Sequence, residues 1–329
     1  MGRIIHLTKL WYNTGNLNNS INDSYHQDEL KNLNPFWVTG LIDGEGAFTI
    51  SIFKSADRKT GWHIRPSFSI ELHNKDLAIL LSLLSFFSVG NIRTRSHNEQ
   101  SSIYSVNSVE ELSRVIIPFF DKYPLLTKKR ADFILFKQVV TIMNNKQHLT
   151  LEGLNKIIEI RASMNKGLSK ILSDNFSNLI PMARPCVELN GTIDPYWLAG
   201  FTNAEGCFFI NISKSKTIQG YSVQLKFVLT QHSKDKQLME YIGIYLGCGR
   251  YEARSGGKLA GSLVVSKLSD LSGKIIPFFD KYLILGNKRK DYADFKRATD
   301  ILMKKAHLTG EGLAEIRNIK RGMNRGRED

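Results

Sequence analysis

Cysteine is scarce in this chain, and long apolar runs are absent from it. Its 329 residues include three cysteines, none of which stands in a CxxC pair. Such a set argues against a disulfide framework or a zinc knuckle, and it fits a reducing compartment. The longest apolar stretch, residues 77–90, is too short to span a bilayer. We therefore interpret it as a core helix and expect no membrane partner.

Acidic residues are also few in comparison with basic ones. The chain has 45 lysines and arginines against 31 aspartates and glutamates, which gives a formal net charge of +14. This imbalance predicts an extended anionic partner, with nucleic acid ahead of a membrane surface. The hydrophobic fraction of 42% and the aromatic fraction of 10% are those of a folded protein. The length suits two domains of about 100–150 residues each.

The chain contains an internal repeat. The octapeptide IIPFFDKY occurs at residues 116–123 and again at 275–282, and HLTLEGL at 148–154 returns as HLTGEGL at 307–313. Both offsets are 159 residues, so we interpret the chain as two homologous domains fused head to tail. We expect a flexible polar arm at 1–30, a first domain at 31–167, a linker at 168–193 and a second domain at 194–329.

Each copy predicts the same series of elements. The dipeptides at 34–35 (NP) and 194–195 (DP) are typical of a helix N-cap followed by proline in the first turn. We expect these helices to end in a left-handed stop at Gly46 and Gly206. Alternating apolar and polar residues then predict strands with one packed and one open face. The order α-β-β-α-β-β-α-α, present twice about a pseudo-twofold axis, predicts an α+β fold with a four-stranded antiparallel sheet in each half.

The first helix of each copy carries small residues one turn apart. They are Gly40 and Gly44 in the first copy, and Gly200 and Ala204 in the second. Small residues at this spacing let two helix backbones approach closely. We therefore expect these four positions to form the interface between the two domains.

Glu45 and Glu205 occupy the last turn of these two helices. If the helices pack together, the carboxylates lie side by side, next to the partial negative charge of both helix C-termini. A divalent cation with oxygen ligands, typical of Mg²⁺, relieves that repulsion, and the carbonyls of Gly44 and Ala204 could complete such sites. Taken singly, each glutamate also fits a solvated surface turn. Its recurrence in both copies favours the metal site.

Two segments of the sequence resemble the motif of a known family. VTGLIDGEG at 38–46 and LAGFTNAEG at 198–206 resemble the LAGLIDADG motif of homing endonucleases. The resemblance covers residues 34–326 and is to the single-chain, two-motif type of the fungal mitochondrial intron-encoded branch. It implies a monomer in the mitochondrion whose saddle-shaped sheets lie in the major groove of a DNA duplex.

The resemblance also implies a reaction. In the family the last acidic residue of each motif, here Glu45 and Glu205, binds metal at a scissile phosphate and helps to generate a metal-bound nucleophilic water. One phosphodiester is hydrolysed in each strand, which leaves short 3′ overhangs. Mg²⁺ is the expected cofactor, Mn²⁺ is expected to substitute for it, and Ca²⁺ is expected to support binding without cleavage.

Three further side chains are candidates for the catalytic site by their position in the repeat. A basic residue near the scissile phosphate is usual in the family, and Lys129 and Lys288 stand at the corresponding places. Contact with backbone phosphates or solvent is the alternative for both lysines. Gln231 stands where relatives place a water-ordering side chain, whereas the first copy has Leu72 there. The predicted water network is therefore unequal between the halves.

The open faces of the two predicted sheets carry a mixed polar set. Arginine with asparagine and glutamine suits bidentate reading of guanine and adenine edges, whereas a non-specific binder would present mostly lysine and arginine. An ordinary solvated sheet face is the alternative. Two different faces predict a non-palindromic duplex target of about two helical turns. The predicted DNA-binding residues are Thr49, Ser51, Lys59, Arg65, Ser67, Ser69, Glu71, Arg93, Arg95, Asn211, Ser213, Lys216, Gln224, Lys226, Thr230, Arg250 and Arg254.

Two other functions are compatible with the same scaffold. An intron RNA maturase would tolerate the loss of Glu45 or Glu205, and both glutamates are present. A sequence-specific DNA-binding protein that does not cleave would bind its site with or without divalent metal. We expect a site-specific double-stranded DNA endonuclease, with these two functions and an intron RNA partner as the alternatives.

Overall fold

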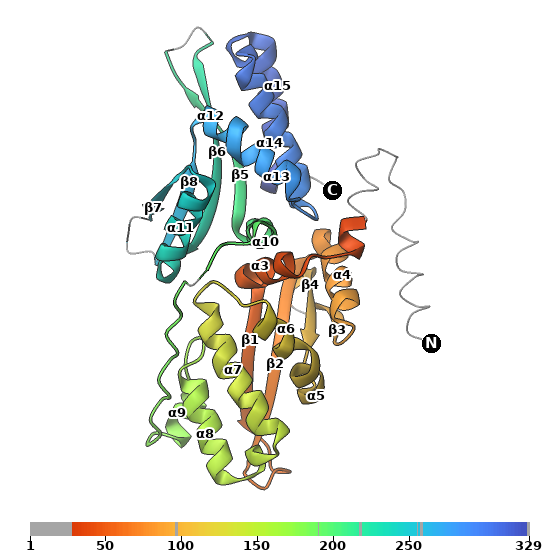
Figure 1. Ribbon diagram of the computed structural model, residues 1–329, viewed down its shortest axis with the longest axis vertical. Helices are drawn as coiled ribbons and strands as arrows, with labels where there is room; N and C mark the ends of the chain where they lie inside the picture. The colour runs from red at the N-terminus through yellow and green to blue at the C-terminus, as the bar shows by residue number, and fades with distance from the viewer. Residues whose placement is uncertain are drawn as a thin grey trace.

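The computed structural model describes residues 28–95, 98–189, 191–216, 219–254, 256 and 259–327 (Figure 1). Residues 1–27 of the predicted arm at 1–30 lie outside the described residues. Its last three residues belong instead to a short helix over 28–31. Leu30 and Leu33 are 5% and 6% exposed, because they pack into the first hydrophobic core. The packed part of the chain therefore begins before residue 31.

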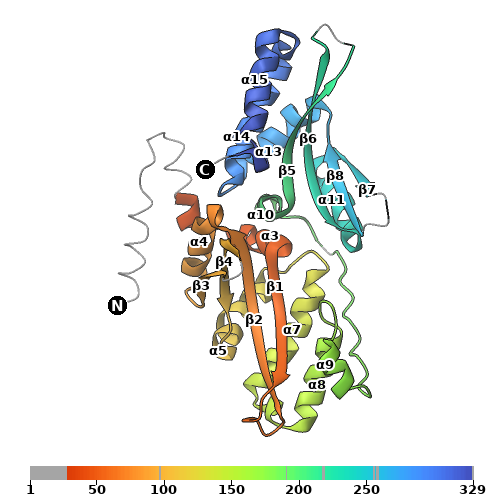
Figure 2. The ribbon, with the colours of Figure 1, turned by 180° about the vertical axis from the view of Figure 1, so that it is seen from behind.

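The first half follows the predicted order. Its elements are α3 (Pro35–Glu45), β1 (Gly46–Lys54), β2 (Trp62–His73), the 3₁₀ turn η1 (Asn74–Asp76), α4 (Leu77–Phe87), β3 (Asn91–Arg95), β4 (Asn98–Val106), α5 (Val109–Glu111), the π-turn η2 (Leu112–Ile116), α6 (Ile117–Lys122), α7 (Lys129–Asn144), the 3₁₀ turn η3 (Gln147–Leu149) and α8 (Leu151–Ala162). The strands form an antiparallel sheet in the order β1-β2-β4-β3. Figure 1 shows α6 and α7 in front of this sheet, and Figure 2, from behind, shows β1 and β2 in front. The helices therefore cover one face and leave the other open.

The second half repeats this arrangement. Its elements are α10 (Pro195–Glu205), β5 (Gly206–Lys214), β6 (Tyr221–His232), the 3₁₀ turn η4 (Ser233–Asp235), α11 (Lys236–Leu246), β7 (Arg250–Ala253), β8 (Ala260–Val265), α12 (Leu268–Asp270), the π-turn η5 (Leu271–Ile275), α13 (Ile276–Lys281), α14 (Lys288–Met303), the 3₁₀ turns η6 (Ala306–Leu308) and η7 (Asn324–Gly326), and α15 (Gly310–Arg321). The sheet order is β5-β6-β8-β7, with antiparallel pairing throughout. The prediction of an α+β fold with two four-stranded antiparallel sheets is confirmed.

Each half has its own aromatic core, and the repeated IIPFF motif supplies part of it. Phe48 of β1 packs edge-on against Phe120 of α6, with ring centroids 5.3 Å apart. The equivalent pair in the second half is Phe208 and Phe279, with centroids 5.8 Å apart. Such edge-to-face pairs add to the hydrophobic stabilisation of a core. Ile116, Ile117 and Phe120 of this motif are buried, and their counterparts Ile275, Ile276 and Phe279 are buried in the second half.

Residues 77–87 of the apolar stretch at 77–90 form the predicted core helix, α4, and Ser88 ends it in the left-handed region. Ile79, Leu80 and Leu83 are buried in the first core. Among the residues that the structure describes, no helix is long and apolar enough to cross a membrane.

Both motif helices begin as predicted, but the conformation at their C-terminal ends differs from the prediction. The side chain of Asn34 accepts a hydrogen bond from the amide of Phe36, and proline follows the cap directly. At the other end Gly46 is extended, with φ −74° and ψ 153°, so the predicted left-handed stop is wrong; Gly206 is likewise extended. A Cβ at Gly46 would lie 2.4 Å from Ile42 Cγ2. Glycine is therefore needed for close packing where α3 passes directly into β1.

The predicted linker contains a helix and lies against the first half. The helix is α9 (Lys170–Asn175), and its Leu172 is buried. Further along, the amide of Met182 donates to the carbonyl of Glu159 in α8. The linker follows the first domain for much of its length before it reaches α10 (Figure 2).

An arginine clamp holds the chain where each half ends. Arg184 of the linker donates through two guanidinium nitrogens to the carboxylate of Asp132 in α7, at 2.8 Å each. In the second half Arg327 reaches Asp291 and Asp294 of α14, at 3.0 and 2.6 Å. Paired charges with such bonds are stable although partly buried. Each clamp fixes the chain against the helix that begins beside the site described below.

Candidate active site

The two motif helices, α3 and α10, pack directly against each other at the centre of the molecule (Figure 1). A Cβ at Gly40 would lie 2.0 Å from the carbonyl oxygen of Trp197, and one at Gly200 would lie 2.0 Å from that of Trp37. A Cβ at Gly44 would lie 2.2 Å from the Cβ of Ala204. No side chain fits at these glycines, so the helices are in backbone contact and join the two halves.

Asp43 ties this helix pair to the loop that precedes α7. Its buried carboxylate accepts hydrogen bonds from the amides of Leu126 and Thr127, at 2.8 and 3.1 Å, and from the Thr127 hydroxyl at 2.6 Å. The indole of Trp197, from the other half, donates a fourth bond at 2.8 Å. Four donors satisfy a buried carboxylate well. Asp43 is therefore occupied with structural contacts.

The second half has a weaker version of this arrangement. Asn203 stands at the equivalent position and accepts one hydrogen bond, from the amide of Leu285 at 2.9 Å. The indole Nε1 of Trp37 is buried and has no hydrogen-bond partner among the described residues. An amide offers one acceptor oxygen where a carboxylate offers two. The pseudo-twofold axis therefore relates two different bonding patterns.

Glu45 and Glu205 are the last residues of α3 and α10. The surrounding protein displaces part of the water around each carboxylate, which raises the pKa of both above the ordinary value. The charge of Glu45 raises the pKa of Glu205 further, whereas Lys129 and Lys288 lower both. The Glu205 side chain also crosses the helix pair, since a Cβ at Gly44 would lie 3.2 Å from its Cγ. The two carboxylates are therefore close enough to interact electrostatically.

Lys129 and Lys288 stand at the first position of α7 and α14 and reach back to the motif helices. The Lys129 ammonium donates to the carbonyls of Ile42 and Gly44, at 2.9 Å each. Lys288 contacts the carbonyls of Thr202 and Ala204, at 3.3 and 3.2 Å. Both lysines are half-buried, and the partial loss of water lowers the pKa of each, whereas the nearby carboxylates oppose that shift. Each cation also offsets the negative end of a helix dipole.

Gln231 lies beside one glutamate only. Its amide Nε2 donates to Glu205 Oε1 at 3.3 Å, from the end of β6. The equivalent residue, Leu72, is partly buried and packs against the first core. Among the residues that the structure describes, Gln231 therefore bonds the Glu205 carboxylate, and the first half has no counterpart of it.

The donor set fits a divalent cation that the substrate helps to hold. The described residues contain no group of three or more His, Cys, Asp or Glu side chains placed to hold a metal ion. The carbonyls of Gly44 and Ala204 accept lysine hydrogen bonds, and each keeps a second lone pair. Mg²⁺ is commonly bound by one or two carboxylates with waters and substrate phosphates. The pair Glu45 and Glu205 matches that pattern.

The predicted DNA-binding residues lie on the strands and hairpin loops of the two sheets, and none of them is buried. In the first sheet Thr49 is opposite Ser67, and Ser51 is opposite Arg65. In the second sheet Asn211 is opposite Gln224. Lys59 and Lys216 follow β1 and β5, in the hairpin connections. The outward-facing rows are thus mostly polar in both halves, with Phe53 and Phe209 as exposed aromatic members.

Two of these residues are bonded to each other. Glu71 accepts from Arg95 Nε at 2.9 Å and from the Ser101 hydroxyl at 2.7 Å. These two donors lower the pKa of Glu71, and the hydroxyl has the larger effect. In the second half the position of Glu71 is taken by Thr230, whose hydroxyl lies 2.9 Å from that of Ser262. The first sheet therefore presents an arginine whose direction is already set.

Other residues of the open sheet face and of the domain boundary were not identified from the sequence. Phe209 is 41% exposed on the open face of the second sheet, and Glu252 pairs with Arg250 there at 2.6 Å. Asp76 and Asp235 reach across the domain boundary to the helices that carry the lysines, with oxygen–nitrogen distances of 2.7 Å. The only signal for these aspartates was their repetition, in NKD at 74–76 and SKD at 233–235.

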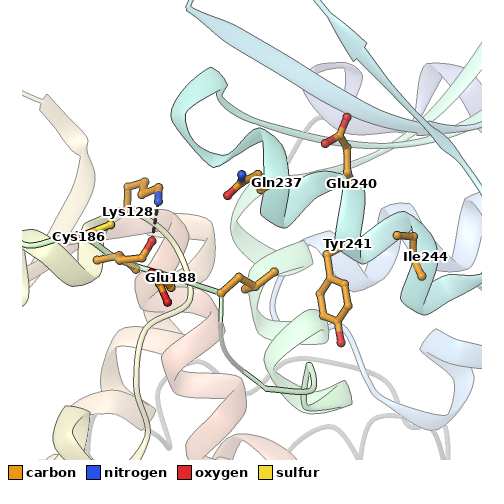
Figure 3. A pocket seen from close by; sticks show the side chains of 9 residues that line it. Lys128, Cys186, Glu188, Gln237, Glu240, Tyr241 and Ile244 are labelled. Atoms are coloured by element: carbon orange, nitrogen blue, oxygen red, sulfur yellow. Dashed lines mark hydrogen bonds between the residues drawn. The ribbon is translucent and has the colours of Figure 1, made fainter.

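A separate cavity of about 480 Å³ lies between the linker and α11 (Figure 3). Lys128 and Glu188 line one side of it, and Tyr241 and Ile244 line the other. The Lys128 ammonium donates to the carbonyl of Val187 at 2.6 Å on the linker side. None of the predicted catalytic residues lines this cavity.

Two repeats that share one helix pair, with a carboxylate at each helix end, define a pseudo-symmetric single-chain protein with one composite site. The family model of the LAGLIDADG endonuclease matches residues 38–140 and again residues 198–299. These matches cover more than half of the chain, and the chain belongs to the LAGLIDADG endonuclease family.

Named relatives agree with this assignment. "Probable intron-encoded endonuclease 3" of Neurospora crassa is 42% identical over 286 residues, which are 86% of this chain and 53% of the relative. "Probable intron-encoded endonuclease 2" of the same organism is 38% identical over 303 residues, 88% of this chain and 65% of the relative. The chain thus spans between half and two thirds of the length of these relatives.

Solved structures match the whole fold. The homing endonuclease I-SmaMI bound to cleaved DNA is 45% identical, with a TM-score of 0.87 over 90% of this chain and 98% of that chain. I-LtrWI bound to target DNA is 40% identical, with a TM-score of 0.87 over 89% and 98%. Both neighbours are LAGLIDADG homing endonucleases in complex with DNA.

Proposed function

We propose that the protein is a site-specific endonuclease that hydrolyses one phosphodiester in each strand of a long, non-palindromic DNA duplex and leaves short 3′ overhangs. The observation that carries the proposal is the shared site at the α3–α10 junction. There Glu45 and Glu205 meet at the ends of two helices in backbone contact, with a half-buried lysine on each side. The site lies between two sheets that each present a polar face.

Glu45 and Glu205 would hold divalent metal ions, Mg²⁺ in the first place and Mn²⁺ as a substitute. When bound, such an ion lowers the pKa of a water and stabilises negative charge on phosphate oxygens. The raised pKa of both glutamates indicates that each charge is costly without a cation partner. Gln231 orients the Glu205 carboxylate through its amide.

Lys129 and Lys288 serve as the fixed positive charges of the site. Each ammonium lies within hydrogen-bond reach of the helix end that precedes a glutamate, and it would meet a phosphate that enters the site. A cation aimed at developing charge in a site with little water is an effective electrostatic catalyst. Single and double lysine-to-alanine variants of I-SmaMI have been solved. The two lysines of that double variant are separated by the same 159 residues as Lys129 and Lys288.

The two sheets would read the target, one half-site each. DNA-bound neighbours of 40% and 45% identity support this role. The different polar rows on the two faces favour a target without twofold symmetry, of about two helical turns. I-SmaMI has been solved on an uncleaved target in the presence of calcium ions, which supports Ca²⁺ as a cofactor for binding alone. We place the protein in the mitochondrion, as a monomer, by its likeness to intron-encoded relatives.

Selection from a randomised duplex library tests the proposal. The library is incubated with protein in Mg²⁺, and cleaved ends are sequenced; a parallel arm in Ca²⁺ recovers bound duplexes. We expect one enriched site of about two turns, cut with short 3′ overhangs in Mg²⁺ and bound intact in Ca²⁺. Bound duplexes without cut ends in either ion would identify a DNA-binding protein that does not cleave. If the protein neither binds nor cuts any duplex, that result would contradict the proposal and would direct the search to RNA.

A further inference from the structure

Two aspartates connect each half of the molecule to the lysine-bearing helix of the other half. Asp76 ends η1 in the first half, and its Oδ1 accepts a hydrogen bond from the amide of Asn287 at 2.7 Å. Asp235 ends η4 in the second half, and its Oδ1 accepts from the amide of Lys128 at 2.7 Å. Figure 1 shows the start of α11, which follows Asp235, next to the beginning of α7. The contacts are reciprocal across the pseudo-twofold axis.

Each contact falls at a helix N-cap. Asn287 is the N-cap of α14 and Lys128 is the N-cap of α7, and neither uses its own side chain to cap the helix. The first amides of a helix have no partner within it, and an acidic group there stabilises both the amides and the helix dipole. Asp76 and Asp235 supply this group from the opposite domain.

The helix start that each aspartate holds is also the position of a lysine. Lys288 is the first residue of α14 and Lys129 is the first residue of α7. A shift of the helix start moves the lysine backbone directly, whereas the lysine ammonium must stay on the carbonyls at the end of the motif helix. The aspartates therefore contact the chain at or next to the residue that carries each ammonium group.

The two contacts are not equally supported. In the first half the Thr127 hydroxyl also accepts from the amide of Lys129, at 3.2 Å. In the second half the equivalent residue is Gly286, which has no hydroxyl. Gly286 has φ +64°, and a Cβ there would lie 2.3 Å from Asp76 Oδ1. Glycine thus admits the aspartate closely, and α14 depends on Asp76 more than α7 depends on Asp235.

We propose that Asp76 and Asp235 are positioning residues that act in trans between the domains, Asp76 on Lys288 and Asp235 on Lys129. This inference rests on the proposed endonuclease function. Each half then needs its partner domain to place its own lysine, so the two strand cuts are linked through the domain boundary. A substitution in the first domain selectively impairs the lysine of the second.

The test measures each strand separately, on the target selected from the library. The two strands carry different fluorescent labels, and their cleavage rates are followed in Mg²⁺. Lys288→Met and Lys129→Met first define which strand depends on which lysine. The variants under test are Asp76→Ala, Asp76→Asn and Asp235→Ala. Target affinity in Ca²⁺ reports whether each variant is folded and binds.

We expect Asp76→Ala to slow the strand that depends on Lys288 by about tenfold, the effect of losing a cap contact, and the other strand by less than about threefold. Asp76→Asn retains an acceptor oxygen and should recover part of that rate. Asp235→Ala should slow the strand that depends on Lys129, by a smaller factor, because Thr127 remains. The matched control is Asp121→Asn, which breaks an exposed ion pair with Lys137 and should leave both strands unchanged.

Equal slowing of both strands by Asp76→Ala, or slowing of the strand that depends on Lys129, would overturn the inference. If Asp76→Ala fails to bind the target in Ca²⁺, Asp76→Asn decides, since an unchanged strand ratio there also overturns it. Failure of the unmodified protein to cut either strand overturns the proposed function and the inference together. If the unmodified protein cuts both strands and no aspartate variant changes the ratio of the two cleavage rates, only the inference is overturned.

Discussion

Trp197 of the second half donates its indole hydrogen bond to Asp43, whereas Trp37 at the equivalent position of the first half has no partner among the described residues. Other equivalent positions of the site also differ between the two halves. Glu205 has Gln231 beside it, and the loop before α7 has a threonine where the loop before α14 has a glycine. The cores of the two halves show no such difference in kind, since both pack a phenylalanine of IIPFF against the first strand. Packing has kept the halves alike, whereas the polar contacts at their junction have diverged.

The largest expected effect tests what the halves share. Glu45→Gln and Glu205→Gln each remove one carboxylate charge from the junction, and each should reduce double-strand cleavage by more than about 100-fold, because metal ligation is lost. Target binding in Ca²⁺ should stay tight. Gel-shift titrations and cleavage assays on the same target measure both properties. If either variant loses specific binding, its glutamate has a structural role and the two halves are not equivalent in this respect.

The next effect concerns Asp43 and Asn203. Asp43→Asn gives the first half the bonding pattern of the second, and it turns an NH₂ group toward amide and indole donors. We expect a loss of about 2–3 kcal/mol in the free energy of unfolding, as for other hydrogen bonds to buried charged groups. Chemical denaturation followed by fluorescence measures it. The matched change Asn203→Asp should cost less, because its second oxygen can accept from Trp37. Equal losses of unfolding free energy in the two variants would show that the indole hydrogen bonds contribute little to the difference between the halves.

A smaller effect is expected from Gln231→Leu, which makes the second half resemble the first. Loss of the amide bond to Glu205 should slow one strand by about fivefold, with target affinity unchanged. The strand-resolved assay reports the change, and Leu72→Met, which preserves packing, serves as the control. Uniform slowing of both strands would contradict a role for Gln231 at one carboxylate alone.

The smallest effect is expected on the open sheet. Glu71→Gln removes the acid that orients Arg95, and an exposed pair of this kind contributes less than about 1 kcal/mol to stability. Preference at the base that Arg95 reads should fall by about threefold, while preferences in the other half-site stay the same. A second round of library selection with the variant gives these preferences. Changes spread over both half-sites would argue against local orientation of Arg95.

Much of the architecture could be predicted because the information is local or repeated. The repeat offset defined two halves, alternation within the strands defined which face packs, and the small residues of the motif helices predicted their close approach. The ends of the motif helices were predicted less well. Gly46 and Gly206 are the type of residue that ends helices in the left-handed region, but here they serve close packing in an extended conformation.

The contacts across the junction could not be predicted for a physical reason. Asp76 and Asn287 are 211 positions apart in the sequence, and Asp235 and Lys128 are 107 positions apart. No periodicity links such positions, and a backbone amide that donates to a distant carboxylate leaves no trace in residue type. The pairing of Glu71 with Arg95 is similar, since two outward-facing charges on neighbouring strands are compatible with pairing or with solvation.

The arginine clamps bear on how such proteins can be recombined. Arg184 closes the first half and Arg327 closes the second, each on an aspartate near the start of the lysine-bearing helix. A chimera joined between Arg184 and α10 would give each half its own clamp, although the fused domain must still supply the aspartate that caps the helix of the other half. A junction placed before Arg184 would separate Asp132 from the cation that neutralises it. The clamps therefore mark the borders of the exchangeable modules.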